Sequence, residues 1–230
     1  MGSKGLTMTD ERRRRLLLYT FLYLVALVLA LIVYDVDTVG VRHEEIGLSS
    51  ANVWFRNLFD YSEETGYFEP LYYLSKVLMY VSIAPCALWT VLYVKEHIRE
   101  RSLSGVGVDK NLMSTFWLYL ITAFICFIFW LAPVNHSPVL MEGQSEPSVS
   151  FPAISVVIYI IAWMSTIFQI KDYLDEKKTL RRIITVASCV IMGVGIIASL
   201  LSGVYWLTDV GGGILLGGTL VLLATFFYDF

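Results

Sequence analysis

This chain of 230 residues contains few of the side chains that build metal centres or disulfide scaffolds, with three cysteines and three histidines in all. Cys86, Cys126 and Cys189 each lie within an apolar stretch, with no paired spacing and no histidine partner nearby in the sequence. We therefore expect three buried thiols that act as small apolar side chains, and not disulfides, metal ligands or nucleophiles. The sequence predicts no metal site and no cofactor.

Charged residues are also scarce, at 16% of the chain, and no internal repeat, low-complexity run or separate soluble domain is visible. Hydrophobic residues instead make up 57%, and the mean hydropathy is +0.65. They form blocks long enough to cross a hydrocarbon core of about 30 Å, which takes roughly 20 helical residues. The blocks are residues 16–34, 71–93, 112–133, 153–170, 183–201 and 210–227.

These blocks predict an all-α fold, a polytopic membrane protein with six transmembrane helices. A backbone exposed to lipid must satisfy its hydrogen bonds within one segment, and the alternating pattern of a membrane barrel is missing. We expect a basic N-terminal segment over residues 1–15 and one membrane domain over residues 16–230. Pro133 is expected to close the third span, and Pro152 to start the fourth. Residues 49–61 have apolar side chains at helical spacing, so an interfacial helix and a loop packed across the top of the bundle are both open.

The basic residues are distributed unevenly between the two sides of the membrane. Residues 1–15, 94–111 and 171–182 hold 14 of the 17 lysines and arginines. The positive-inside rule places these segments, and with them both termini, in the cytoplasm. The loops on the opposite side are acidic and hold Arg42 and Arg56 as their cations. We expect an integral protein of the plasma membrane that contacts membrane lipid and has no nucleic-acid partner.

Three short elements lie at the outward ends of the predicted helices. The first is Trp-Leu-Ala-Pro-Val-Asn-His-Ser-Pro over residues 130–138, and the second is Ser-Phe-Pro-Ala-Ile-Ser over residues 150–155. The third is Ser-Leu-Leu-Ser-Gly-Val-Tyr-Trp-Leu-Thr-Asp over residues 199–209. The predicted topology puts all three on one side of the membrane, separated by helices, so that they converge on one place.

In order and surroundings these elements resemble the signature motifs of the type 2 phosphatidic acid phosphatase superfamily, also called lipid phosphate phosphatases. In that family the first element carries a lysine and, seven residues on, an arginine followed by proline. The second reads Pro-Ser-Gly-His. The third carries an arginine, a histidine six residues on and an aspartate four residues further. The resemblance extends from about residue 45 to residue 227 and implies the six-helix bundle of that family.

Carried over residue by residue, the resemblance implies a vestigial pocket that has lost most of its chemistry. Five positions differ from the family: Trp130 stands at the lysine, Ser137 and Ser199 at the two arginines, Ser155 at the second motif's histidine and Tyr205 at the nucleophilic histidine. Three positions keep the family's residue, namely Pro138, Pro152 and Asp209. Shifting the second motif to residues 147–150 still leaves a serine at the histidine position.

The family's mechanism, as the resemblance implies it, needs the groups that are missing. It uses a histidine nucleophile oriented by an aspartate, a second histidine as proton donor, and three cations that hold the phosphate. Each missing cationic contact forfeits about 1.5–3 kcal/mol. The phenol of Tyr205 is protonated at neutral pH and is a poor nucleophile. Asp209 has no imidazole left to orient.

Two functions stay open on this evidence, and we expect no catalytic residue in the favoured one. That one is a pseudo-phosphatase that binds a lipid, or contacts a membrane protein partner, without hydrolysis. The alternative is a diverged phosphatase or transferase acting on a lipid phosphate or isoprenyl diphosphate at the outer membrane face, with His136, Tyr205 and Asp209 forming its site. A transporter or channel component is disfavoured, because the spans lack charged residues in mid-membrane and paired broken helices.

Two further features have a structural and a functional interpretation. Lys76 lies about two helical turns inside the second span and could bind a lipid phosphate, although snorkelling to the interface or a pair with Glu69 is the expected role. Gly213 and Gly217 have the spacing that lets membrane helices approach closely. We expect these glycines to serve helix packing and not a ligand.

Overall fold

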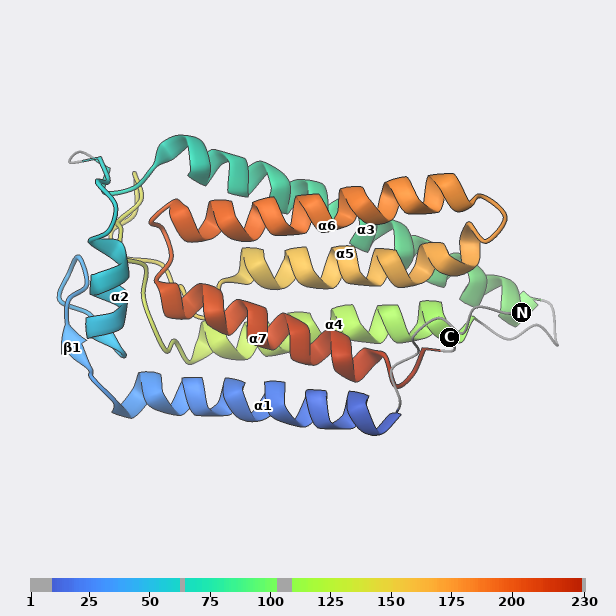
Figure 1. The fold of residues 1–230 in the computed structure, drawn as a ribbon, viewed down its shortest axis with the longest axis horizontal. Coiled ribbons are helices and arrows are strands. Elements are labelled where there is room, and N and C mark those ends of the chain that lie inside the picture. The colour runs from blue at the N-terminus through green and yellow to red at the C-terminus, as the bar shows by residue number, and fades with distance from the viewer. Residues whose placement is uncertain (1–9, 63–64, 103–108, 229–230) are drawn as a thin grey trace.

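The computed structural model describes residues 10–62, 65–102 and 109–228, and its six long helices run side by side as one bundle (Figure 1). All six are long and apolar enough to cross a membrane. They are α1 (Asp10–Val33), α3 (Glu69–Ser102), α4 (Lys110–Leu131), α5 (Ile154–Tyr173), α6 (Lys178–Leu201) and α7 (Leu207–Ala224). The predicted six-helix membrane fold is confirmed, with a two-stranded antiparallel hairpin of β1 (Asp37–Thr38) and β2 (Glu45–Ile46) as a small addition to an otherwise helical chain.

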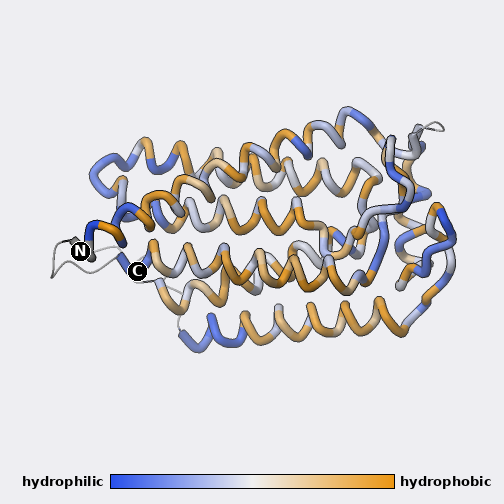
Figure 2. Tube along the Cα trace, turned by 180° about the vertical axis from the view of Figure 1, so that it is seen from behind, coloured by the Kyte–Doolittle hydropathy of each residue, from blue (hydrophilic) through white to orange (hydrophobic). Residues whose placement is uncertain are grey.

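Hydrophobic and hydrophilic residues occupy different parts of the bundle along its long axis. Figure 2 shows hydrophobic residues along the bodies of the helices and hydrophilic residues at both ends. The start of α1 and the end of α7 lie at the same end of the bundle, while the hairpin and the short helix α2 (Ser49–Arg56) lie at the other (Figure 1). This arrangement agrees with the predicted alternation of the spans, which puts both termini on one side of the membrane.

The centre of the bundle is the contact between α5 and α7, the two spans with the largest buried share. Three glycines of α7 allow that contact. A Cβ atom added to Gly212 would lie 2.2 Å from the ring of Phe151, and one added to Gly213 would lie 2.9 Å from the carbonyl oxygen of Ala153. One added to Gly217 would lie 3.1 Å from Ile160. The predicted packing role of Gly213 and Gly217 is therefore confirmed.

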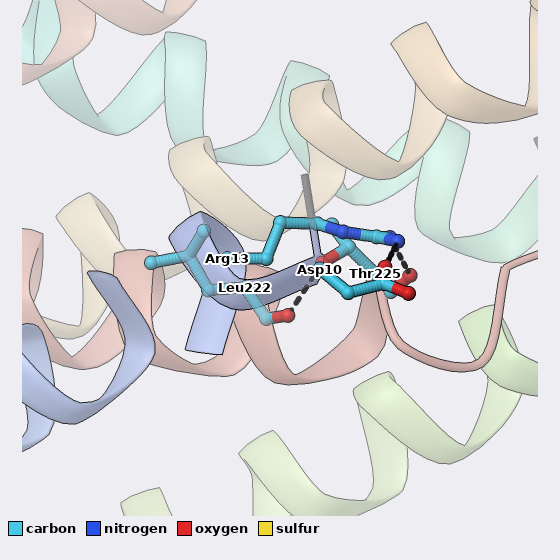
Figure 3. Close-up of polar contacts among 4 residues, drawn as sticks. All are labelled: Asp10, Arg13, Leu222 and Thr225. Carbon is cyan, nitrogen blue, oxygen red and sulfur yellow. Dashed lines mark hydrogen bonds and ion pairs between the residues drawn. The ribbon is translucent and has the colours of Figure 1, made fainter. Parts of the chain in front are cut away.

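Helix α1 begins six residues before the expected span and takes in the basic residues at its start. Figure 3 shows Arg13, which donates to the carbonyl oxygen of Thr225 at 3.0 Å and also contacts Asp10. Its guanidinium lies 5.5 Å from the ring centre of Phe226. A cation at the carboxyl end of a helix satisfies exposed carbonyl groups and complements the helix dipole, so Arg13 fastens α1 to the end of α7. Residues 1–9 of the expected basic segment lie outside the described residues.

The two interpretations of residues 49–61 combine in the structure. Residues Ser49–Arg56 form helix α2, and this helix packs across the end of the bundle against α7. Asn52 is buried there, donates to the Thr208 hydroxyl at 2.9 Å and accepts from the Thr208 amide at 3.1 Å. Trp54 points away and is 63% exposed.

Several expectations about single residues need correction. Helix α3 continues through Pro85 and extends beyond residue 93, the predicted end of the span. The prediction followed the apolar residues, whereas the last turns of the helix are polar. Pro152 does not start α5, since Ala153 is the N-cap and Ile154 the first helical residue. Cys86 and Cys126 are half-buried and Cys189 is exposed, so the three thiols are not all buried.

Candidate functional site

The three sequence elements meet at the end of the bundle that carries α2 and the hairpin. The loop between α4 and α5 folds onto the turn between α6 and α7. The Ser137 hydroxyl donates to the carbonyl oxygen of Val204 at 3.0 Å, and the indole of Trp206 donates to the carbonyl oxygen of His136 at 2.8 Å. The amide of Ala153 donates to the carbonyl oxygen of Asp209 at 3.0 Å. The second and third elements and most of the first therefore form one continuous site.

Asp209 is the centre of the connections between these loops. Its side chain is fully buried, at 0% exposure. One carboxylate oxygen accepts from the side-chain amide of Asn135 at 3.0 Å, and the other accepts from the backbone amide of Trp206 at 3.0 Å. A carboxylate in the first turn of a helix that accepts from the N-cap amide stabilises the helix start. Both oxygens of Asp209 thus hold the turn before α7 and the first sequence element together.

A cluster of neutral hydroxyl groups fills the interior beside this turn. The Ser199 hydroxyl lies 2.9 Å from that of Ser75 and 3.3 Å from that of Ser155. The phenol of Tyr159 donates to the carbonyl oxygen of Ser75 at 2.6 Å. All four residues are buried. We call Ser75, Ser155, Tyr159, Ser199 and Tyr205 the hydroxyl cluster; they bring together three of the positions that the sequence assigned to the vestigial pocket.

Tyr205, which the sequence resemblance aligns with the family's nucleophile, lies in the turn between α6 and α7, and Ser155 lies beside its phenol. Burial raises the pKa of Tyr205, and the nearby Tyr159 and Asp209 raise it further. The direction of this shift matters, because a phenol with a raised pKa keeps its proton at neutral pH. Tyr205 is therefore a neutral phenol in this site and not a phenolate.

The structure separates one predicted member from the rest of the site. Trp130 is 60% exposed, and its ring stacks on Phe127 in the last turn of α4, with 5.8 Å between the ring centres. It faces out of the bundle, so its assignment to the pocket is wrong. Pro138 and Pro152 are both buried, next to Ser137 and to the first turn of α5, and they shape the loop without offering a polar side chain.

His136 and Lys76 also take positions that the sequence did not settle. His136 lines a separate hollow of about 670 Å³, together with Glu44 and Glu45 and the ends of α1 and α4, and thus lies apart from the hydroxyl cluster. The Lys76 ammonium lies 5.4 Å from the ring centre of Tyr72. Both Lys76 and Glu69 are described, and they form no ion pair, so the expected pair is wrong, while snorkelling of Lys76 to the interface stays a prediction.

A cation that belongs to none of the three sequence elements also lies at this site. Arg56, the last residue of α2, donates to the carbonyl oxygens of Gly203 and Gly66, each at 2.6 Å. Its guanidinium lies 4.8 Å from the ring centre of Tyr61, and burial lowers the pKa of Arg56. The sequence feature that could have singled out Arg56 is the scarcity of cations in the outward loops, where Arg42 and Arg56 are the two present. Its donors are directed at backbone carbonyls, so it fastens α2 to the third element.

Ser75, Tyr159 and Asn135 were missed in the sequence analysis. Ser75 lies 124 residues from Ser199 along the chain, and Tyr159 lies 84 residues from Ser75. Asn135 lies inside the first element, at a position that the family motif leaves open. No metal-binding group of three or more histidine, cysteine or acidic side chains is present among the described residues.

A bundle of six membrane-crossing helices with these three loop elements gathered at one end has the fold of the membrane-bound PAP2-type phosphatases. The chain is similar in structure to a transmembrane PAP2-type phosphatidylglycerolphosphate phosphatase from Bacillus subtilis. That similarity has a TM-score of 0.62, covers 92% of this chain and 94% of the other, and goes with 14% sequence identity. The sequence itself matches no protein-family model and no curated protein sequence.

Proposed function

We propose that this protein is a non-hydrolytic member of the type 2 phosphatidic acid phosphatase superfamily that binds a lipid headgroup at the vestigial site. The observation that carries the proposal is the hydroxyl cluster. Ser155, Ser199 and Tyr205 stand together where the family motifs have a histidine, an arginine and the nucleophilic histidine, and their neighbours Ser75 and Tyr159 are neutral too.

Phosphoryl transfer in a neutral cluster lacks both a nucleophile and charge stabilisation. A cation that holds the developing charge contributes about 1.5–3 kcal/mol for each contact. Three such contacts correspond to roughly 10³ to 10⁶ in rate, even before the loss of both imidazoles is counted. Arg56 does not replace them, because its donors hold the carbonyl oxygens of Gly203 and Gly66.

The rim of the site supports binding of a headgroup with low charge. Lys76 lies over the ring of Tyr72, which is itself near Tyr205. One ammonium group with phenol donors beside it suits a phosphodiester, which carries a single negative charge. A phosphomonoester carries about −1.5 to −2 at neutral pH and would need more cations. The ligand that we infer is therefore a glycerophospholipid headgroup of the outer leaflet, with the outward orientation and the plasma membrane taken from the distribution of basic residues.

The proposal is tested by two measurements on purified protein. Phosphate release from phosphatidic acid and from an isoprenyl diphosphate should equal that of a heat-treated control. Binding of phosphatidylglycerol, followed by native mass spectrometry, should weaken about fivefold in Lys76→Gln. Lys95→Gln, at the far end of α3, is the matched control and should bind as the parent does.

Turnover would favour the alternative function. If phosphate release exceeds the control and disappears in Tyr205→Phe or His136→Ala, the protein is a diverged phosphatase or transferase and the proposal is wrong. Lipid binding that is equal in Lys76→Gln and the parent would also contradict it, because the rim then contributes nothing. A partner protein that co-purifies and blocks this binding would place the same site in a membrane complex.

A further inference from the structure

A groove lies between α5 and α6 at the end of the bundle opposite the candidate site. It encloses about 580 Å³. Four of its lining residues are cations: Lys171 from the last turn of α5, and Lys178, Arg181 and Arg182 from the first turns of α6. Its floor includes Ile167 and Val186, which are apolar. The groove therefore has a basic rim over an apolar floor.

The nearby carboxylates neutralise this rim only in part. Asp175 lies 3.5 Å from Arg181, in an exposed ion pair. Asp172 accepts from Asn111 at 2.7 Å and so is directed toward α4. No carboxylate is among the described residues that line the groove. Four cations line the groove, so the rim has an excess of positive charge.

The start of α6 adds a second source of positive potential. Its N-cap is Lys177, and no side chain caps the first amide groups of the helix. Uncapped amides at a helix start favour an anion, through their hydrogen atoms and the helix dipole. They lie in the same turn as Lys178, so both sources act on the mouth of the groove.

We propose that this groove binds an anionic phospholipid of the leaflet on the side of the chain termini. The phosphate lies among the four cations, and one acyl chain follows the apolar floor. The floor leads to a face of α6 that is open to lipid, where Ile183 is 60% and Val190 56% exposed. Basic pockets between membrane helices bind anionic headgroups in this way, and long cationic side chains reach the interface. A free phosphate would use the rim and leave the floor empty, so a lipid fits the whole groove.

The test uses Lys178→Gln with Arg182→Gln, made in the Lys76→Gln background so that lipid binding at the other end of the bundle is already weakened. Native mass spectrometry with added phosphatidylglycerol measures the lipid bound. The parent background should bind one molecule in preference to phosphatidylcholine. The two added substitutions should weaken binding roughly thirtyfold, at about 1 kcal/mol for each basic residue near the membrane surface.

Three controls make the outcome decisive. Lys95→Gln with Arg99→Gln removes the same charge at the same end of the bundle, from α3, and should change binding less than about twofold. Val186→Trp fills the floor without changing charge and should also weaken lipid binding. Millimolar inorganic phosphate should not displace the lipid. Equal losses in the groove and control variants, no loss in the groove variant, or displacement by phosphate would each overturn the proposal.

Discussion

Substitutions of Asp209 can distinguish a structural role of its side chain from a catalytic role. In Asp209→Ala, the Trp206 amide loses its acceptor, and the Asn135 side-chain amide keeps only a long contact of 3.5 Å with the Thr208 hydroxyl; both donors are buried. A buried donor left without a partner costs about 1–3 kcal/mol, so we expect a loss of roughly 2–6 kcal/mol in the free energy of unfolding. For a chain of this size that lowers Tm by roughly 4–24 °C.

Asp209→Asn is the informative comparison. It keeps one oxygen for the Trp206 amide, and its new amide can donate to the side-chain oxygen of Asn135 once that amide rotates. That oxygen has no partner among the described residues. We therefore expect a loss of about 1 kcal/mol and a fall in Tm of only about 2–4 °C. Thermal unfolding in detergent, followed by tryptophan fluorescence, measures both variants. Equal falls in the two variants, or no fall in Asp209→Ala, would refute the structural role.

Three further predictions concern topology, pH dependence and the origin of the site. A cysteine at Gly143 should react with an impermeant thiol reagent from outside intact cells, and one at Asp175 should not; the reverse pattern would invert the orientation. Because burial raises the pKa of Tyr205, the unfolded phenol ionises first, so this contribution to stability is complete below about pH 10 and is lost above it. Tyr205→Phe should therefore lessen the fall in Tm on the alkaline side, and an unchanged profile would contradict the assigned burial. Ser155→His, Ser199→Arg and Tyr205→His together should give a folded protein that binds vanadate in a salt-dependent way, whereas the parent should not; no gain would count against the motif alignment.

The sequence predicted the membrane helices because length and hydropathy alone decide which segments cross a bilayer. It placed their ends less well. Residues 10–15 and the last turns of α3 carry charges. The hydrophobic segment therefore ends before the helix does, and the helix continues into the polar region. Helix propensity of arginine, glutamate and lysine is high, and no proline or glycine interrupts these turns.

Contacts in the candidate site could be predicted from the sequence only where both residues belong to the same short element. Asp209 and Tyr205 share a turn, and their proximity follows from sequence. Trp130 was misplaced because counting seven residues back from Ser137 ignores where α4 ends and which way its last turn faces. The bond between Arg56 and Gly203 joins residues 147 apart, and no local pattern contains such a pairing.

Under the proposed function, the motif positions that the sequence resemblance keeps in this chain are ones that contribute to the fold. Pro138 and Pro152 are buried in the loop that joins α4 to α5. Asp209 is buried in the first turn of α7, where it accepts two hydrogen bonds. In the same proposal, the positions that differ from the family within the site would need a charge only for hydrolysis. An arginine at Ser199 without a phosphate would leave a buried charge unpaired, at a cost of about 3–5 kcal/mol, whereas a serine is satisfied by Ser75 and Ser155. Selection for stability without hydrolysis would keep the first group and neutralise the second, which is the division seen here.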